Sequence, residues 1–130
     1  MSIVKNEPKY KNGLLQAIRE EKPIVIYGDY DCDGVCASAI LLDTLEKMGA
    51  DVQPYIPDRH REGYGLNMDA VEKLAKTYQV LVTVDCGITS VQEVALAKEK
   101  GMQVIVTDHH TVGDALPAAD AVVTPHLGNY

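Results

Sequence analysis

The fold is decided by the segment IVIYGDYDCDG, residues 24–34, in which four β-branched or aromatic residues lead directly into glycine and three aspartates. A short apolar run of this kind is typical of a buried strand. A helical pattern follows over residues 35–48 and ends at Gly49. Because a strand that is apolar throughout must be covered on both of its faces, this segment favours an α/β fold built on a parallel sheet.

The same alternation of strand and helix recurs along the chain. We expect further strands at residues 52–56, 80–84, 104–107 and 121–123, and further helices at residues 13–20, 68–78 and 91–100. Asn67 is the expected N-cap of the helix at 68–78, and Ser90 with Glu93 forms a capping-box pattern before the helix at 91–100, which ends at Gly101. The pattern predicts a five-stranded parallel sheet, doubly wound, with helices on both faces.

The length and composition of the chain are typical of one globular domain. The chain has 130 residues, of which 46% are apolar and 24% charged, and this balance excludes a disordered tail. The densest apolar stretch, residues 35–42, is much shorter than the ~20 residues of a membrane-spanning helix. The first residues lack the pattern of a secretory signal. Three cysteines argue against a disulfide framework, and their single Cys-x3-Cys pair is too little for a zinc finger. We therefore expect a cytoplasmic protein with no membrane association.

Acidic residues gather in a few places. The formal charge is −7, from 19 acidic and 12 basic residues, which argues against indiscriminate binding of nucleic-acid backbone by a basic surface. Five of the acids belong to three short motifs: Asp29, Asp31, Asp33, Asp85 and Asp108. Much of the acidity is therefore expected to belong to a site.

The three motifs each follow a predicted strand directly. They are DYDCDG at 29–34, DCGI at 85–88 and DHH at 108–110. Carboxyl ends of parallel strands share one edge, and ligands bind there near a topological switch point, so the motifs should converge. Carboxylates brought together in a crevice repel one another unless they are protonated or held by cations. Oxygen and imidazole ligands suit Mn²⁺ or Mg²⁺, and a carboxylate that bridges two such ions is a usual device for phosphate-ester hydrolysis.

Other known motifs fit the sequence less well. Any one of the motifs alone is compatible with ordinary turn chemistry. A calcium-binding EF-hand loop starting at Asp29 would need glutamate where Ile40 stands, and neither a dinucleotide-binding fingerprint nor a P-loop is present. A phospho-acceptor receiver domain matches the length and the strand-helix alternation, but residues 124–126, Thr-Pro-His, stand where its lysine belongs. The receiver-like signalling domain stays an alternative, although it leaves the motif at 108–110 without a role.

In this order and spacing, the motifs resemble those of the DHH phosphoesterase superfamily. Residues 56–67, IPDRHREGYGLN, are similar to its RecJ branch, the single-strand-specific DNA exonucleases that act from the 5′ end in DNA repair and recombination. The resemblance runs from about residue 14 to residue 126. It implies a hydrolase that uses two Mn²⁺ ions, or Mn²⁺ and Mg²⁺. Other substrates in the superfamily are oligonucleotides, cyclic dinucleotides and pyrophosphate, which remain an alternative.

The resemblance also implies roles for individual residues. The implied metal ligands are Asp29, Asp31, Asp33, Asp85 and His109, with Asp85 as the bridge. Asp108 is expected to orient His109 by accepting its second ring proton, and His110 is expected to face the scissile phosphate. In the loop between the predicted strand at 52–56 and the predicted helix at 68–78, Arg59 and Arg61 suit phosphate contact. Tyr64 suits either stacking on a base or packing against the protein.

Members of the superfamily continue beyond the matched region with a further metal-binding aspartate and a second domain that grips substrate. The chain is therefore expected to be the N-terminal part of a DHH domain, with the remainder and the second domain absent. Single-stranded DNA is the expected partner, bound weakly by this chain alone because few basic side chains oppose its net charge.

Overall fold

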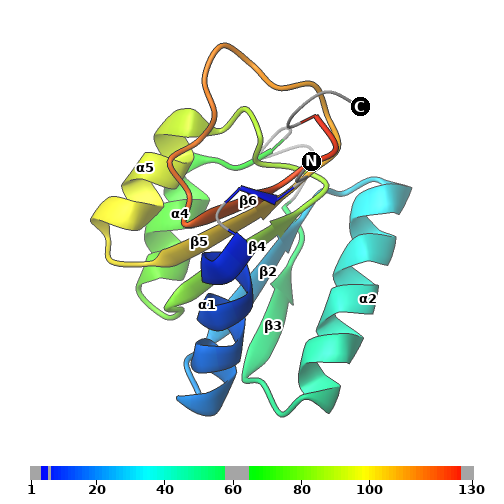
Figure 1. Ribbon diagram of the computed structural model, residues 1–130, viewed down its shortest axis with the longest axis vertical. Coiled ribbons are helices and arrows are strands. Elements are labelled where there is room, and N and C mark those ends of the chain that lie inside the picture. The colour runs from blue at the N-terminus through cyan, green and yellow to red at the C-terminus, as the bar shows by residue number, and fades with distance from the viewer. Residues whose placement is uncertain (1–3, 6, 58–64, 127–130) are drawn as a thin grey trace.

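The computed structural model describes residues 4–5, 7–57 and 65–126. It contains one twisted sheet with helices packed on either side, shown in Figure 1. The strands lie in the order β1-β6-β5-β4-β2-β3. Their bounds are Val4–Lys5 for β1, Ile24–Gly28 for β2, Val52–Tyr55 for β3, Val80–Val84 for β4, Gln103–Thr107 for β5 and Ala121–Val123 for β6.

Strands β2 to β6 are parallel to one another, which confirms the predicted five-stranded parallel sheet. The sheet also has a short edge strand that the sequence did not reveal. In β1, Val4 pairs with Val123 in the antiparallel direction. Two residues are too few to show a period-two pattern, so this strand could be found only from its pairing.

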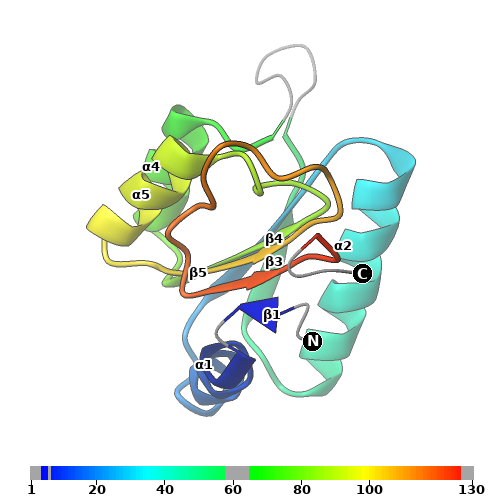
Figure 2. The ribbon, with the colours of Figure 1, turned by 45° about the horizontal axis from the view of Figure 1, so that its top comes forward.

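Helices cover both faces of the sheet, as predicted. Helices α4 (Met68–Ala75) and α5 (Val91–Glu99) lie on one face, and α1 (Glu7–Arg19) and α2 (Cys32–Lys47) lie on the other, as Figures 1 and 2 show. Successive residues of β2 point to opposite faces and join separate apolar clusters. Val25 belongs to the cluster under α4 and α5, and Ile24 to the one under α1 and α2. Burial on both faces explains why these strands are apolar throughout.

Helix ends differ from the predicted ones where local chemistry outweighs periodicity. Helix α1 begins at Glu7 instead of residue 13, because its first two turns carry polar residues that give no apolar stripe. Helix α2 begins at Cys32, since Asp31 caps it by accepting a hydrogen bond from the Gly34 backbone N–H at 2.9 Å. The acidic motif after β2 is therefore partly helical, which fixes its side chains.

The two predicted helix caps have different outcomes. Asn67 accepts a hydrogen bond from the Ala70 N–H at 2.8 Å and caps α4, as expected. The capping box before α5 is wrong. Ser90 makes no side-chain cap hydrogen bond, because its backbone, with ψ of 58°, lies outside the extended region that such a cap requires. Its N–H closes a turn on the Gly87 carbonyl instead.

Across the described ranges, no helix combines the length and the apolar character that crossing a membrane would require.

Candidate metal centre

The three acidic motifs converge at the carboxyl edge of the sheet. Strands β5, β4 and β2 are neighbours at its centre. The chain passes from β2 outward to β3 and then returns to β4 on the other side of β2, so the switch point lies between β2 and β4. Two of the motifs begin directly at this point, and the third begins one strand away. The predicted convergence is therefore present in the structure.

The first group of potential ligands consists of Asp29, Asp31 and Asp85, whose carboxylate oxygens lie within 4.8 Å of one another. Asp29 is 2% exposed, and its Oδ1 accepts the Tyr30 N–H at 2.8 Å. Burial raises the pKa of Asp29. Asp31 is exposed, and the hydrogen bond from the Gly34 N–H lowers its pKa. Like charges held this close favour a cation among them.

Gly34 allows the first turn of α2 to press against the end of β2. A Cβ atom at this position would meet the backbone O, C and N of Asp29, which cannot rotate away. The close approach brings Asp31, the N-cap of α2, next to Asp29. The glycine of the DYDCDG motif is therefore a packing requirement of the site.

The backbone of Asp85 adopts a left-handed conformation directly after β4, with φ of 59°. Its N–H donates to the Thr107 carbonyl at 3.0 Å, which ties it to the end of β5. Gly87, with φ of 101°, continues the turn, and the Thr83 hydroxyl donates to the Cys86 carbonyl at 2.8 Å. A left-handed conformation in a residue other than glycine costs energy and is often found at functional sites.

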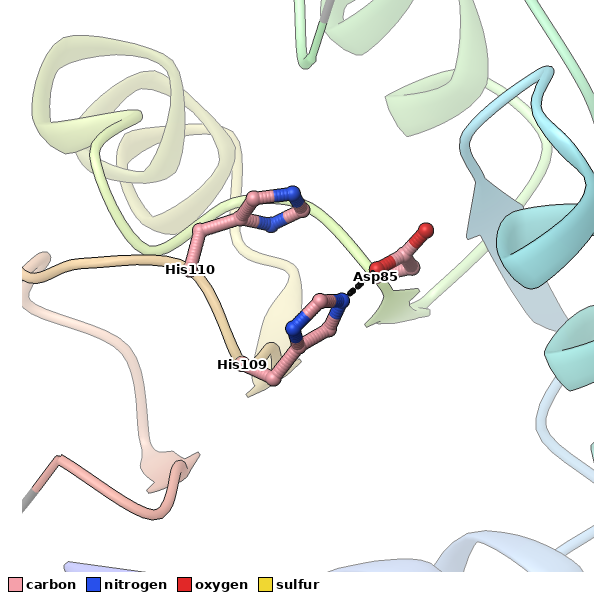
Figure 3. Close-up of side chains that lie close together, drawn as sticks. All are labelled: Asp85, His109 and His110. Atoms are coloured by element: carbon pink, nitrogen blue, oxygen red, sulfur yellow. Dashed lines mark ion pairs between the residues drawn. The ribbon is translucent and has the colours of Figure 1, made fainter.

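The Asp85 side chain supplies the test of whether a cation fits. Asp85 is 7% exposed, and among the described residues neither of its carboxylate oxygens accepts a hydrogen bond. His109 Nε2 lies 2.6 Å from Oδ1 and forms an ion pair with it when the ring is protonated, as Figure 3 shows. Burial, with the neighbouring Asp31 carboxyl, raises the pKa of Asp85. A buried carboxylate that lies beside Asp29 and Asp31 needs more positive charge than one histidine ring supplies, and a divalent cation fits that need.

Asp108 holds His110, which corrects the expectation that it would hold the ring of His109. Asp108 Oδ1 lies 2.6 Å from His110 Nδ1 and also accepts the backbone N–H of His109 at 2.8 Å. Its Oδ2 accepts the Ile88 N–H at 3.1 Å. The Asp108 carboxylate raises the pKa of His110. The pairing differs because the His109 ring turns toward Asp85 instead, while the two imidazole rings stack with centroids 4.4 Å apart.

The remaining predicted ligands lie around the same space. Asp85, His109 and His110 form a second group whose ligand atoms lie within 4.8 Å of one another. Asp33, exposed on the first turn of α2, belongs to neither group but lines a shallow pocket with Asp85, Asp108 and His109. Asp33 therefore lies in the wall of this pocket, beside the two groups of potential ligands.

Sequence reasoning missed one residue at this edge. His126, just after β6, has its Nε2 2.7 Å from the His109 carbonyl oxygen, and the contact fixes the backbone of a predicted ligand. β6 ends at the same edge as β4 and β5, so the rule that located the other motifs also applies to residues 124–126. The sequence alone does not show that β6 lies beside β5, so nothing in it marked residues 124–126 as part of the site.

The predicted substrate residues Arg59, Arg61 and Tyr64 lie outside the described residues. The segment that follows them is anchored at the site. Tyr27, buried at the end of β2, donates its hydroxyl to the Gly65 carbonyl at 3.2 Å and accepts from Asn67 Nδ2 at 3.3 Å. The loop therefore returns to the sheet beside the strand that carries Asp29.

Comparisons with known proteins agree with this arrangement. Residues 23–129 match the DHH family, N-terminal domain. The chain is 48% identical over 111 residues to the single-stranded-DNA-specific exonuclease RecJ of Bacillus subtilis, covering 85% of this chain and 14% of that protein. It is 46% identical over 114 residues to RecJ of Thermus thermophilus, covering 88% and 17%.

Solved structures give the same result. A crystal structure of exonuclease RecJ bound to manganese superposes with a TM-score of 0.88 at 42% identity, covering 98% of this chain and 33% of that one. RecJ of Thermus thermophilus in complex with Mn²⁺ superposes with a TM-score of 0.82 at 40% identity, covering 95% and 17%. The chain thus spans only a minor part of the length of the proteins it matches.

Proposed function

The chain belongs to the DHH family, and from this premise we propose that it carries the metal-binding part of a site that hydrolyses phosphodiester bonds of single-stranded DNA from the 5′ end. One observation carries the proposal: the buried Asp85 carboxylate has no hydrogen bond among the described residues, although two further aspartates and His109 surround it. The substrate is supported by the identity of 48% to a single-stranded-DNA-specific exonuclease.

We propose that the metals are held by Asp29, Asp31, Asp85 and His109, which belong to the two ligand groups, and that Asp33 joins them from the wall of the adjoining pocket. Asp85 is the proposed bridge, because it alone belongs to both ligand groups. Bound Mn²⁺ or Mg²⁺, two ions in the complete enzyme, supplies Lewis-acid stabilisation of the charge that develops on the phosphate oxygens. Oxygen and imidazole donors are the ligand set that such hard cations prefer.

The protein's own groups would position the substrate. Asp108 fixes the His110 ring through a contact of 2.6 Å to Nδ1, and we propose that the ring oriented in this way faces the scissile phosphate. Because the same carboxylate raises the pKa of His110, the ring keeps its proton at higher pH than a free histidine. His110 is thus suited to stabilise charge on the scissile phosphate, and Asp108 acts through it as a positioning residue.

For the strand itself, we propose Arg59 and Arg61 as phosphate contacts and Tyr64 as a stacking residue. The support is the place where their loop returns to the sheet: Tyr27 holds Gly65 and Asn67 beside the end of β2. Guanidinium groups bind phosphate in a planar, two-point manner, and aromatic rings stack on bases of any sequence.

The chain spans 14% of its Bacillus relative and 20% of its Escherichia coli one, so activity of the whole protein is a proposal. We propose that residues 1–130 act as the N-terminal part of a DHH domain, and that full turnover needs the opposite wall of the substrate cleft. We further propose that the protein works in DNA repair and recombination in the cytoplasm. The support is that its relatives are single-stranded-DNA-specific exonucleases and that its three cysteines form no disulfide.

The test is an assay of Mn²⁺-dependent cleavage on 5′-phosphorylated single-stranded DNA, with duplex DNA, a cyclic dinucleotide and pyrophosphate as competing substrates. The assay uses the full-length protein of which residues 1–130 are a part, and compares it with the Asp85→Asn variant of the same length. We expect mononucleotides from single strands only, and none from the variant. Cleavage of the cyclic dinucleotide or pyrophosphate alone would replace the proposed substrate by the second candidate. A phosphorylated aspartate after treatment with acetyl phosphate would instead support the receiver-like alternative.

A further inference from the structure

Two cysteines that the proposed metal site does not use lie side by side at the start of α2, where Asp31 and Asp33 flank Cys32 in the sequence. Cys36 lies four positions after Cys32, so the two residues occupy the same face of the helix on successive turns. Their Sγ atoms lie 4.0 Å apart, and both residues are exposed. The proposed function uses neither of them. Two free thiols at this separation form a two-donor group that is open to solvent.

The helix does not favour a disulfide between these thiols. Cβ atoms at this spacing in a helix lie about 5–6 Å apart, whereas a disulfide requires about 3.5–4.5 Å. Closing the bond would unwind the turn that Asp31 caps and that Gly34 packs against Asp29. The pair is therefore poorly placed for direct bonding between the two sulfurs.

The observed separation does suit an ion between the sulfurs. Two metal–sulfur bonds of about 2.3 Å at a tetrahedral angle place the sulfur atoms about 3.8 Å apart. The Sγ atoms are 4.0 Å apart without any movement of the helix. The helix thus presents two adjacent corners of a tetrahedral site already in position.

We propose that Cys32 and Cys36 bind one thiophilic divalent ion of the zinc and cadmium type, separately from the carboxylate cluster. In binding, each sulfur donates a lone pair to the ion and each thiol releases one proton to solvent, with no change of oxidation state. Among the described residues, neither cysteine belongs to a group of three potential ligands, so water completes the coordination. The affinity is accordingly below that of a four-ligand structural site.

Donor chemistry keeps the two sites apart. Thiolates select zinc-like ions, and carboxylates select Mn²⁺ or Mg²⁺. Cys86, the third cysteine, is buried and donates its thiol toward the Tyr27 carbonyl at 3.6 Å, so it does not compete for an ion from solvent.

The test is a titration of the chain with Cd²⁺ in the presence of saturating Mn²⁺ and a phosphine reductant. Sulfur-to-cadmium charge-transfer absorption reports thiolate binding, and Mn²⁺ occupies the carboxylates. We expect saturation at about one ion per chain in the wild type, and binding weaker by about tenfold or more in Cys32→Ser and in Cys36→Ser. Ala39→Ser, which adds the same hydroxyl at an exposed position of the same helix, is the matched control and should bind as the wild type does.

Three outcomes would overturn the proposal. They are the absence of the absorption in the wild type, its persistence in the double variant that retains only Cys86, and its appearance together with dimers in size-exclusion chromatography, which would place the ion between two chains. Both cysteine variants alter exposed positions, and circular dichroism verifies that they fold.

Discussion

Replacing Gly34 with alanine should damage both the fold and the metal response, although the change adds one methyl group to a helix. The new Cβ would meet backbone atoms of Asp29, at 2.7 Å from its N and C. No rotation of a side chain can relieve that contact. Relief requires the first turn of α2 to move away from β2, which would separate Asp31 from Asp29 and Asp85.

Two opposing effects set the magnitude. Alanine in place of glycine stabilises a helix by up to about 1 kcal/mol. Overpacking against a rigid neighbour destabilises by about 1–3 kcal/mol, and by more where backbone must shift. For Gly34→Ala we therefore expect a net loss of about 1–2 kcal/mol in the free energy of unfolding, together with the loss of most of the stabilisation by Mn²⁺.

Urea denaturation with and without Mn²⁺ measures both quantities. Gly49→Ala is the matched control at the other end of α2: its backbone has φ of 87°, and a Cβ there would meet nothing within 4 Å. This control should lose stability through backbone strain alone and keep its full response to Mn²⁺. A Gly34→Ala protein as stable as the wild type, with an unchanged metal response, would refute the reasoning.

Three further predictions follow from other parts of the molecule. Asp85→Asn should leave the metal-free chain at least as stable as the wild type, because it removes a buried charge and asparagine tolerates φ of 59°. The same variant should abolish the rise in melting temperature with Mn²⁺, and a retained rise would contradict the ligand assignment. Asp120→Ala should lower the free energy of unfolding by about 1.5–3 kcal/mol, because Asp120 accepts hydrogen bonds from Lys98 Nζ at 2.7 and 2.9 Å and from the Val104 N–H at 2.8 Å. Chemical denaturation should show that loss, and the response to Mn²⁺ should be unaltered. Binding of single-stranded DNA by the 130-residue chain should be weak and fall steeply with added salt, so submicromolar affinity at physiological ionic strength in fluorescence anisotropy would be inconsistent with its charge.

The sequence was sufficient for the five parallel strands of the sheet and for its functional edge, because both depend on patterns that repeat. Runs such as residues 80–84 are apolar at nearly every position, and such runs predict strands buried on both faces. Once the strands are parallel, residues that follow them must share an edge, and this placed Asp29 with Asp85 without any knowledge of side-chain contacts.

The sequence was insufficient where a single contact decides between neighbours. Which histidine ring meets Asp108 depends on rotamers of adjacent residues, and the structure pairs it with His110 while His109 turns to Asp85. The cap of α5 failed for a similar reason, since the pattern at Ser90 is correct but its backbone angles are not. His126 was missed because its role depends on the position of β6 beside β5.

The most direct test of the central claim, that these carboxylates and His109 form a divalent metal site, is a titration of Mn²⁺ followed by the electron paramagnetic resonance signal of the free ion. The wild-type chain should suppress the signal in a saturable manner, and Asp85→Asn should leave it as large as in buffer. Equal signals for the wild type, the variant and buffer would contradict the account.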